Sequence, residues 1–218
     1  MRERCLLYYI TDRSQFRGDE SSRRNELLAK VAEASRAGVN YIQLREKDLS
    51  GRELENLARE AVSVIRANSP VTRLLINSRT DVALAVGADG VHLRAEDVAP
   101  SEVRRAWQLA ALQPRTAENF LIAASCHTPS DVSRAEAERC DFAVFAPVFA
   151  KTGAGASPPA GLSALREACE AKIPVLALGG VTIENATSCL QAGAAGVAGI
   201  RLFQENRIQD VVRTLRSL

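Results

Sequence analysis

The sequence lacks the features that mark several classes of protein. Its five cysteines lie far apart and form no Cys-x-x-Cys pair, so their spacing predicts neither a zinc site nor a disulfide framework. No apolar run approaches the roughly 20 residues that a membrane-spanning helix needs. The apolar run near the N-terminus is too short for a secretory signal, and charged residues soon follow it. We therefore expect a cytoplasmic protein with reduced thiols.

An excess of charge of one sign is also missing. The 28 basic and 26 acidic residues give a formal net charge of +2, which is too balanced to predict binding to nucleic acid or to an anionic membrane. The rest of the composition is ordinary, with 46% hydrophobic and 25% charged residues. This is typical of a globular protein that buries its core without cross-links.

Short apolar runs alternate with longer amphipathic ones eight times along the 218 residues. The short runs are bounded by Gly, Pro or polar residues, as strands buried on both faces should be. We expect strands at 6–11, 41–45, 74–77, 90–93, 121–125, 142–147, 175–179 and 197–200. The longer runs predict helices, among them 26–37, 51–67, 129–139, 162–171 and 183–192. Ser50 and Thr128 occupy N-cap positions, and Gly38, Gly87 and Gly193 follow helix ends.

This alternation predicts parallel strands joined by right-handed crossovers. An open, doubly wound sheet is the alternative. Eight units without an insertion, and no Gly-x-Gly-x-x-Gly motif after the first strand, favour a closed barrel. A compact barrel needs roughly 200 residues. We therefore expect one α/β domain over residues 1–218, a single (β/α)8 TIM barrel.

In such a barrel, polar residues just after a strand face the active site. Strand alternation after the second expected strand places Gln43, Arg45 and Lys47 on one side. An amide and two cations at a barrel mouth predict a site for an oligo-anion such as a diphosphate, which Arg binds as a fork and Lys as a point charge. A salt-bridge network at the rim is the alternative.

The third and fourth expected strands end in further candidates. Asn77 can hydrogen-bond a phosphate oxygen or a ring nitrogen, or it can simply cap the next helix. Asp97 can hold a Mg²⁺ that bridges phosphate oxygens, since Mg²⁺ often takes only one or two carboxylates plus substrate. A lone loop carboxylate is also often merely solvated. His92, within its strand, fits a packed core histidine.

Polar groups also follow the fifth and seventh expected strands. Ser125 and His127 stand together, and the imidazole is suited to proton transfer. Gly179 and Gly180 can offer backbone N–H groups to a phosphate, although tight turns alone would also need glycine. The loop 151–160 after the sixth strand is a candidate lid, or simply a permissive surface loop.

Seven motifs, each weak alone, form a strong pattern when they occur in order at barrel spacing. They are YITD (9–12), QLREKD (43–48), INSRTDVALAVGADGVHLRAED (76–97), SCHT (125–128), PVF (147–149), LGGVTIENA (178–186) and AGAAGVAGI (192–200). Together they cover nearly the whole chain and resemble the thiamine phosphate synthase family and its TenI-like thiazole tautomerase relatives.

The resemblance implies a transferase that couples hydroxymethylpyrimidine diphosphate to thiazole phosphate and releases pyrophosphate. It implies a dissociative step, in which a pyrimidinylmethyl cation forms and the thiazole nitrogen captures it. Such a step needs charge stabilisation and positioning rather than covalent catalysis by the protein. It also implies that the pyrimidine diphosphate and the thiazole phosphate bind at separate residues. The pyrimidine diphosphate would lie at Gln43, Arg45, Lys47, Asn77 and Ser125, and the thiazole phosphate at Gly179 and Gly180.

The sequence departs from the family pattern at three places. Ser78 stands where synthases usually have a second magnesium carboxylate, and Arg201 stands where a small hydroxyl residue is usual. Lys151 and Thr152 are shifted equivalents of a Thr-x-Thr-Lys run. These departures weaken magnesium–diphosphate chemistry more than phosphate binding.

The leading hypothesis is therefore a Mg²⁺-dependent thiamine phosphate synthase. Its candidate catalytic residues are Arg45, Lys47, Ser125 and His127; its substrate-binding residues are Gln43, Asn77, Lys151, Thr152, Gly179, Gly180 and Arg201; its metal ligands are Asp97 and, weakly, Ser78. A TenI-like tautomerase that uses His127 without a metal is the second hypothesis, and a non-catalytic phosphate-ligand-binding barrel is the third. We expect the protein to bind small phosphorylated pyrimidine and thiazole substrates, and to bind neither nucleic acid nor a membrane. The sequence leaves open whether it forms a homo-oligomer.

Overall fold

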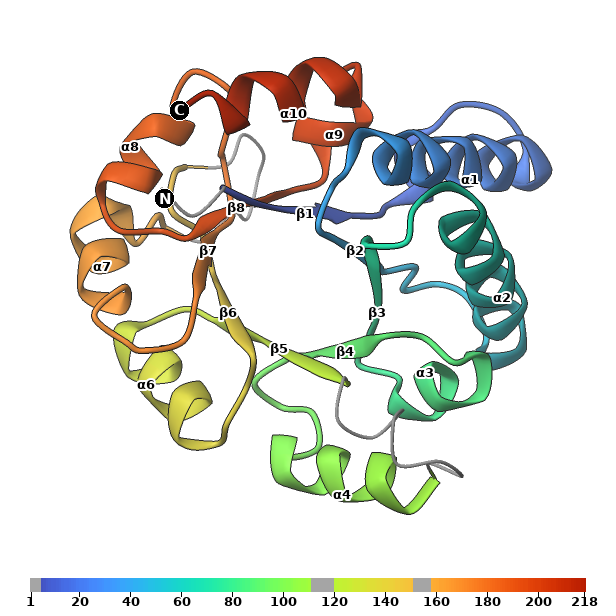
Figure 1. Cartoon of the computed structure of the whole chain (residues 1–218), viewed down its shortest axis with the longest axis horizontal. Helices are drawn as coiled ribbons and strands as arrows, with labels where there is room; N and C mark the ends of the chain where they lie inside the picture. Colours follow the sequence, from blue (N-terminus) through green and yellow to red (C-terminus); the bar gives the residue numbers. More distant parts are fainter. Residues whose placement is uncertain (1–4, 111–119, 151–157) are drawn as a thin grey trace.

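The computed structural model describes residues 5–110, 120–150 and 158–218. Its strands form a closed parallel barrel in the order β1 to β8, with helices around the outside (Figure 1). This arrangement confirms the expected (β/α)8 class. The strands are β1 (Leu6–Ile10), β2 (Tyr41–Leu44), β3 (Arg73–Asn77), β4 (Gly90–Leu93), β5 (Leu121–Cys126), β6 (Phe142–Phe145), β7 (Val175–Ala177) and β8 (Gly196–Gly199).

Each expected strand is present, and most differ from the prediction by a residue or two at one end. The helical elements are η1 (Arg13–Gln15), α1 (Glu20–Ala37), α2 (Gly51–Asn68), α3 (Thr80–Val86), α4 (Pro100–Ala110), α6 (Pro129–Ala137), α7 (Gly161–Ala168), α8 (Ala186–Gln191), α9 (Arg201–Gln204) and α10 (Ile208–Arg216). The helix expected at 26–37 begins earlier, because the Asp19 carboxylate accepts the backbone N–H of Ser22 and caps it. The helix expected at 183–192 is shorter at both ends.

Side chains at the expected caps explain where two helices start. Ser50 before α2 and Thr128 before α6 each form a reciprocal capping box with an acidic residue three positions on. Gly38 and Gly87 end α1 and α3 in the left-handed conformation, which glycine adopts without a steric penalty. These four predicted caps are therefore confirmed, whereas α8 is capped by Ala192 and Gly193 follows that residue.

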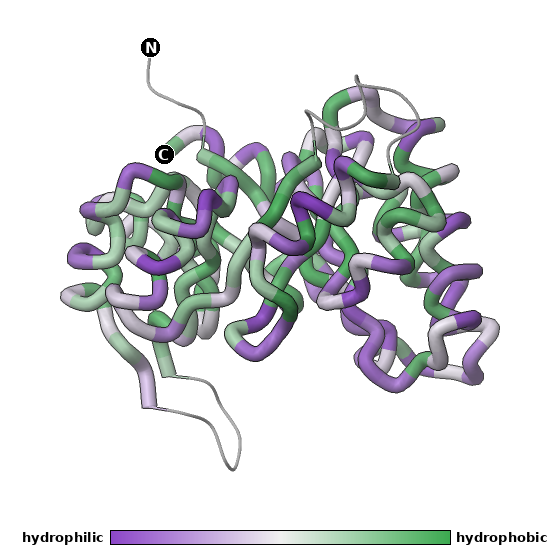
Figure 2. The backbone as a smooth tube through the Cα atoms, turned by 90° about the horizontal axis from the view of Figure 1, so that it is seen from below, coloured by the Kyte–Doolittle hydropathy of each residue, from purple (hydrophilic) through white to green (hydrophobic). Residues whose placement is uncertain are grey.

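The apolar residues form two layers. One lies between the strands and the helices, and the other fills the barrel interior with side chains that include Tyr8, Leu75, Phe142 and Leu176. Figure 2 shows the body from the side, with hydrophobic and hydrophilic stretches alternating along the backbone. Because the interior is plugged by these side chains, the barrel is a packed core rather than a pore. Space for a ligand lies beyond this plug.

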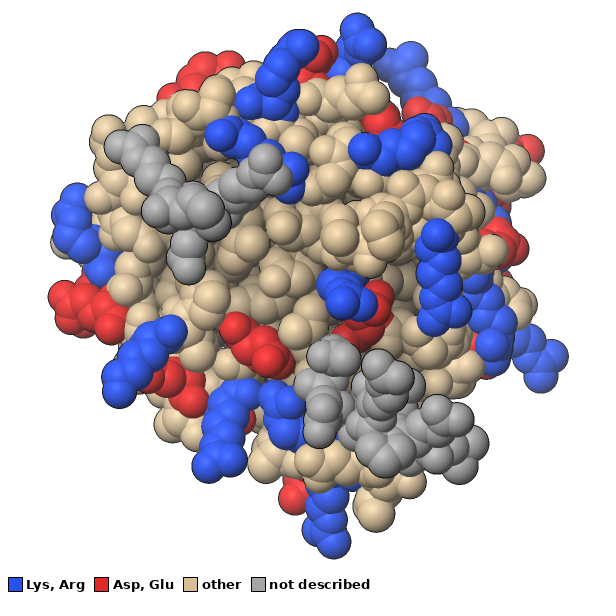
Figure 3. All heavy atoms as spheres, in the orientation of Figure 1, with Lys and Arg blue, Asp and Glu red and all other residues tan. Residues whose placement is uncertain are grey.

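Charged side chains of both signs are interspersed around the rim of the face seen in Figure 3. Within the described ranges, no helix has both the length and the apolar character that crossing a membrane would require.

Candidate active site

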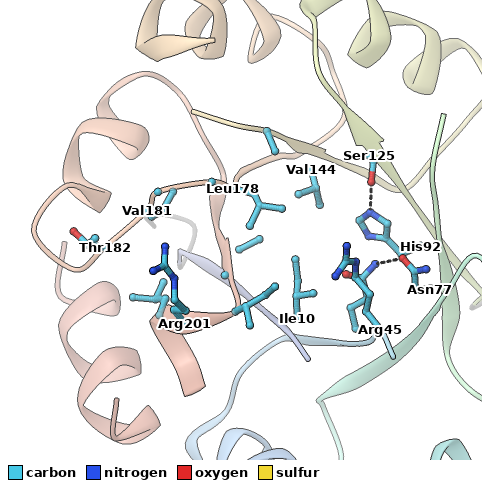
Figure 4. A pocket seen from close by; sticks show the side chains of 18 of the residues that line it. Ile10, Arg45, Asn77, His92, Ser125, Val144, Leu178, Val181, Thr182 and Arg201 are labelled. Carbon is cyan, nitrogen blue, oxygen red and sulfur yellow. Dashed lines mark hydrogen bonds between the residues drawn. The ribbon is translucent and has the colours of Figure 1, made fainter. Parts of the chain in front are cut away.

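A cavity of about 960 Å³ lies at the carboxyl ends of the strands. Inward-facing residues of the last barrel layer form its floor, and they divide into two halves. Strands β2 to β5 contribute the polar side chains Gln43, Asn77, His92 and Ser125, whereas β1, β6 and the end of β7 contribute Ile10, Val144 and Leu178 (Figure 4). The strand register thus produces one polar and one apolar half in a single cavity.

Two amides in the polar half hold one another in place. Gln43, which is 2% exposed, donates from Nε2 to Oδ1 of Asn77 at 3.2 Å. Asn77 in turn donates from Nδ2 to the Ser78 hydroxyl at 3.1 Å. The unused hydrogen-bonding groups of both amides are directed by these contacts, as recognition of a polar ligand requires.

Arg45 brings a cation to the polar half (Figure 4). Its backbone N–H donates to Thr11 Oγ1 at 3.0 Å, while the guanidinium makes no ion pair with any other residue that the structure describes. Burial lowers the pKa of Arg45, and Arg94 adds to this effect, while the charges of Asp12 and Glu46 oppose it only in part. An incompletely solvated, unpaired guanidinium at a cavity wall is a binding group for an anion.

Lys47 lies in an exposed turn and is not among the residues that line the cavity. Strand β2 ends at Leu44, so the alternation that would align Lys47 with Arg45 stops before it. The charge of Arg45 lowers the pKa of Lys47, with smaller contributions from burial and from Arg94. Three cations therefore repel one another at this edge, and an anion bound between them would relieve the repulsion.

The turn that carries Arg45 and Lys47 is anchored from behind by Arg13. The buried Arg13 guanidinium donates to Glu46 at 3.0 Å and to both carboxylate oxygens of Asp48 at 2.8 Å. Glu46 also accepts the Thr11 hydroxyl at 2.6 Å and the backbone N–H of Arg13 at 3.0 Å. Because Arg13 holds both carboxylates, neither of them pairs with the Arg45 guanidinium, which stays available at the cavity wall.

His92 connects two side chains that are far apart in the sequence. It is 3% exposed, with Nδ1 at 3.0 Å from the Tyr8 hydroxyl and Nε2 at 2.8 Å from Ser125 Oγ (Figure 4). Burial, together with the charge of Arg45, lowers the pKa of His92 to about 3. The ring is therefore neutral at physiological pH.

The second histidine, His127, is exposed at the cavity wall. Its Nδ1 lies 2.7 Å from the carbonyl oxygen of Ala146. A carbonyl only accepts, so Nδ1 carries the hydrogen and Nε2 is left for a ligand. The neighbouring Cys126 is buried, and burial raises the pKa of its thiol to about 12, which leaves it a poor nucleophile.

The predicted metal ligands meet beside the cavity, outside its lining. Asp97 accepts the backbone N–H of Arg94 at 2.7 Å and its guanidinium at 2.9 Å. Burial raises the pKa of Asp97, but hydrogen bonds from Arg94 and Ser78 outweigh it and hold the pKa below its ordinary value. Ser78 has φ of 60°, a left-handed conformation that is uncommon outside glycine. In the described part of the chain, no group of three or more His, Cys, Asp or Glu residues could hold a metal.

The opposite end of the cavity is formed by Gly179, Gly180 and Arg201. Gly180 has φ of +66°, and a Cβ there would lie 2.8 Å from that of Phe149, so only glycine fits. Arg201 is exposed and points into the cavity beside Thr182 (Figure 4). Among the described residues it forms no ion pair, so a second free guanidinium faces the one of Arg45 across the apolar floor.

The structure thus brings Gln43, Arg45, Asn77, Ser125, His127, Gly179, Gly180 and Arg201 to one cavity, whereas Lys47, Ser78 and Asp97 lie at its margin. Lys151 and Thr152 lie outside the described residues, as does most of the proposed lid at 151–160. Sequence reasoning missed Arg13, Arg94 and Tyr8. The contacts of Arg13 with Glu46 and of Tyr8 with His92 are visible only once the barrel has closed, since 33 and 84 residues separate the partners.

A closed (β/α)8 barrel with a partly polar cavity at the carboxyl ends of its strands, and with Arg45 and Arg201 in the lining, is the architecture of a barrel enzyme. Residues 7–203 match the model of the family described as thiamine monophosphate synthase, and the chain belongs to this family.

Relatives agree with this assignment. The chain is 40% identical over 200 residues to a putative thiamine-phosphate synthase 2 of Aquifex aeolicus, covering 91% of this chain and 97% of that protein. It is 39% identical over 214 residues to a thiamine-phosphate synthase of Methanoculleus marisnigri, covering 96% and 93%. A solved thiamine phosphate pyrophosphorylase from Pyrococcus furiosus superposes with a TM-score of 0.78 at 29% identity, covering 99% and 96% of the two chains.

Proposed function

We propose that the protein couples hydroxymethylpyrimidine diphosphate to thiazole phosphate, forming thiamine phosphate and releasing pyrophosphate. The observation that carries the proposal is the two-ended cavity, with Arg45 at one end, Arg201 at the other and an apolar floor between them (Figure 4). Two phosphorylated substrates need two cationic sites, and their aromatic rings need an apolar surface on which to meet. Membership of the synthase family supports the same reaction.

In this proposal the diphosphate lies at the Arg45 end. Arg45 binds it through its guanidinium fork, while Arg94 in the cavity lining and Lys47 at the margin add positive charge. Cations that are already in place stabilise the charge that grows on the leaving group when the C–O bond breaks, without any reorganisation cost at that moment. Gln43, Asn77 and Ser125 hold the pyrimidine ring, so that its methylene carbon faces the apolar half.

The residues at the margin fit a magnesium ion only in part. Asp97 and Ser78 provide one carboxylate and one hydroxyl, and Mg²⁺ accepts such a set when substrate phosphates and water supply the remaining oxygens. Bound there, Mg²⁺ would neutralise charge on the diphosphate. Arg94 already donates to Asp97, so metal binding has to displace that contact.

The thiazole phosphate lies at the other end in this proposal. Backbone around Gly179 and Gly180 approaches the phosphate without a side chain in the way, and Arg201 adds a charged donor. Ile10, Val144 and Leu178 offer the pyrimidinylmethyl cation no nucleophile and exclude water, which would otherwise compete with the thiazole nitrogen.

A TenI-like tautomerase is the second candidate, and His127 favours it. The contact with Ala146 leaves Nε2 free at the cavity wall, where it can move a proton on a thiazole carboxylate phosphate. This reaction needs neither a diphosphate at the Arg45 end of the cavity nor a metal.

One assay separates these candidates. The purified protein is mixed with both phosphorylated precursors and Mg²⁺, and thiamine phosphate is measured by chromatography with and without EDTA. A parallel mixture contains the thiazole carboxylate phosphate instead, and its tautomerisation is measured under the same two conditions. Product that disappears with EDTA supports the proposal. Tautomerisation that survives EDTA, without thiamine phosphate, would overturn it in favour of the second candidate. Tight ligand binding without turnover would favour a non-catalytic barrel.

The cytoplasmic location, the absence of a nucleic-acid partner and the oligomeric state stay predictions. The location is supported by the five cysteines, all of which are free, as is usual in a reducing compartment.

A further inference from the structure

Tyr8, His92 and Ser125 form a chain of hydrogen bonds that leads from the barrel core to the cavity. Tyr8 is completely buried, and its ring packs edge-on against Tyr41 and Phe142. Its hydroxyl lies 3.0 Å from Nδ1 of His92, and Nε2 of the same ring lies 2.8 Å from Ser125 Oγ (Figure 4). His92 and Ser125 both line the cavity, and of the three residues only Ser125 is partly exposed.

The two possible directions of this chain are not equivalent. If Nδ1 carried the hydrogen, it would donate to the Tyr8 oxygen, and the phenolic O–H would need a separate acceptor. In the described part of the chain, the hydroxyl of Tyr8 has no hydrogen-bonding partner other than His92. Leaving a buried donor unpaired costs about 1–3 kcal/mol. Tyr8 therefore donates to Nδ1.

This direction determines the rest of the chain. A neutral imidazole has one hydrogen, so Nε2 carries it and donates to Ser125 Oγ. The serine oxygen then accepts on its buried side, and its own hydrogen is free to point into the cavity. The ligand atom that contacts Ser125 must therefore be an acceptor.

We infer that Tyr8 and His92 are positioning residues that make the Ser125 hydroxyl a hydrogen-bond donor toward the substrate. The inference rests on the proposed function for the identity of that substrate. In the pyrimidine diphosphate, the acceptors that fit are a ring nitrogen or a phosphate oxygen. A group that presents only N–H donors at this point is disfavoured, because Ser125 has a donor facing it.

The two histidines are expected to be opposite tautomers. His127 carries its hydrogen on Nδ1, because that atom faces the Ala146 carbonyl oxygen at 2.7 Å. His92 carries it on Nε2. The chain has only 2 histidines, so both rings can be resolved in one long-range ¹H–¹⁵N spectrum of ¹⁵N-histidine-labelled protein without any ligand. The His127→Asn variant assigns the two sets of signals.

The expected spectrum shows His92 protonated at Nε2 and His127 at Nδ1, with the His92 ring neutral at pH 7. A His92 ring protonated at Nδ1 would overturn the inference. In Tyr8→Phe the donor to Nδ1 is gone, so the spectrum should change at His92 and stay the same at His127. The matched control is Tyr41→Phe, which removes a phenolic hydroxyl from the same aromatic cluster but not from the chain, and should leave both rings unchanged.

Kinetics then link the chain to the substrate. Tyr8→Phe should lower kcat/KM for the pyrimidine diphosphate about fivefold, the worth of one neutral hydrogen bond, and leave KM for thiazole phosphate unchanged. In a Ser125→Ala background, the same substitution should have no further effect. An equal fivefold loss in that background would show that Tyr8 acts through packing and would contradict the inference. If the wild type forms no thiamine phosphate, the proposed function fails, while the ligand-free spectrum still decides the direction of the chain.

Discussion

Replacing Arg13 with methionine tests whether the turn bearing Arg45 is held from behind. The Arg13 side chain is 5% exposed and that of Glu46 is 1% exposed, with 3.0 Å between the charged atoms. Methionine keeps much of the apolar length of arginine but removes its charge and its donors. The Glu46 carboxylate is then left buried beside an apolar group.

Removing one partner of a buried ion pair costs about 3–5 kcal/mol, because the remaining charge is uncompensated. Glu46 keeps the Thr11 hydroxyl and the backbone N–H of residue 13 as donors, which favours the lower end of this range. A loss of about 3 kcal/mol in a chain of this size lowers Tm by roughly 6–12 °C. Because the turn loses its anchor, KM for the pyrimidine diphosphate should rise as well.

The loss should depend on pH with a defined sign. Burial already raises the pKa of Glu46, and Arg13 is among the groups that oppose the rise. Without Arg13 the folded-state pKa rises further above its unfolded value, so the folded state binds the extra proton. Stability of the variant should therefore be greatest at low pH and fall as pH rises through the folded pKa, by at most about 1.4 kcal/mol per pH unit.

Urea denaturation of the wild type, Arg13→Met and Arg13→Met/Glu46→Gln between pH 5 and pH 8 measures both effects. The double variant has no buried charge left to compensate, so it should regain part of the stability and lose the extra pH dependence. Arg24→Met is the control, since Arg24 pairs with Glu60 at the surface and should cost less than about 1 kcal/mol. A loss in Arg13→Met no larger than in this control would refute the reasoning.

Three further predictions concern the cavity. Arg45→Ala should reduce kcat/KM more than Lys47→Ala, because Arg45 lines the cavity and binds as a fork while Lys47 is exposed; equal losses in steady-state assays would count against this. Ser78→Asp adds a carboxylate next to Asp97, and about 1 kcal/mol of added attraction should lower the Mg²⁺ concentration for half-maximal activity roughly fivefold. If a metal titration shows that this concentration is unchanged or higher, the result would argue against a Mg²⁺ site at residues 78 and 97. Arg201→Ser should raise KM for thiazole phosphate and leave KM for the pyrimidine diphosphate unchanged. A rise in KM for the pyrimidine diphosphate alone would contradict the assignment of Arg201 to the thiazole phosphate.

The barrel could be predicted from the sequence because parallel strands that are buried on both faces consist of short, nearly continuous apolar runs. The layout of the cavity followed from the same rule, since Asn77 and Ser125 occupy inward positions at strand ends. Lys47 shows where this rule stops. Side chains alternate between the two faces only while the chain stays extended, and β2 ends at Leu44. The position of Lys47 in the turn that follows could therefore not be predicted from strand alternation.

Contacts between distant strands could not be predicted. The Tyr8–His92 hydrogen bond spans 84 positions in the sequence and exists because the barrel closes with β1 and β4 facing each other across the interior. Nothing in the local pattern around His92 distinguishes this ring from an ordinary core histidine. Arg13 lies in η1, and only the fold brings it behind the turn that carries Arg45.

The central claim is that one cavity binds two phosphorylated molecules at once, at opposite ends. Calorimetric titration of thiazole phosphate into the protein tests it directly, first alone and then with pyrophosphate and Mg²⁺ at saturation. The account predicts binding of one equivalent in both titrations, because pyrophosphate occupies the Arg45 end and leaves the Arg201 end free. Loss of thiazole phosphate binding in the presence of pyrophosphate would mean that both ligands share one anion site, and would contradict the account.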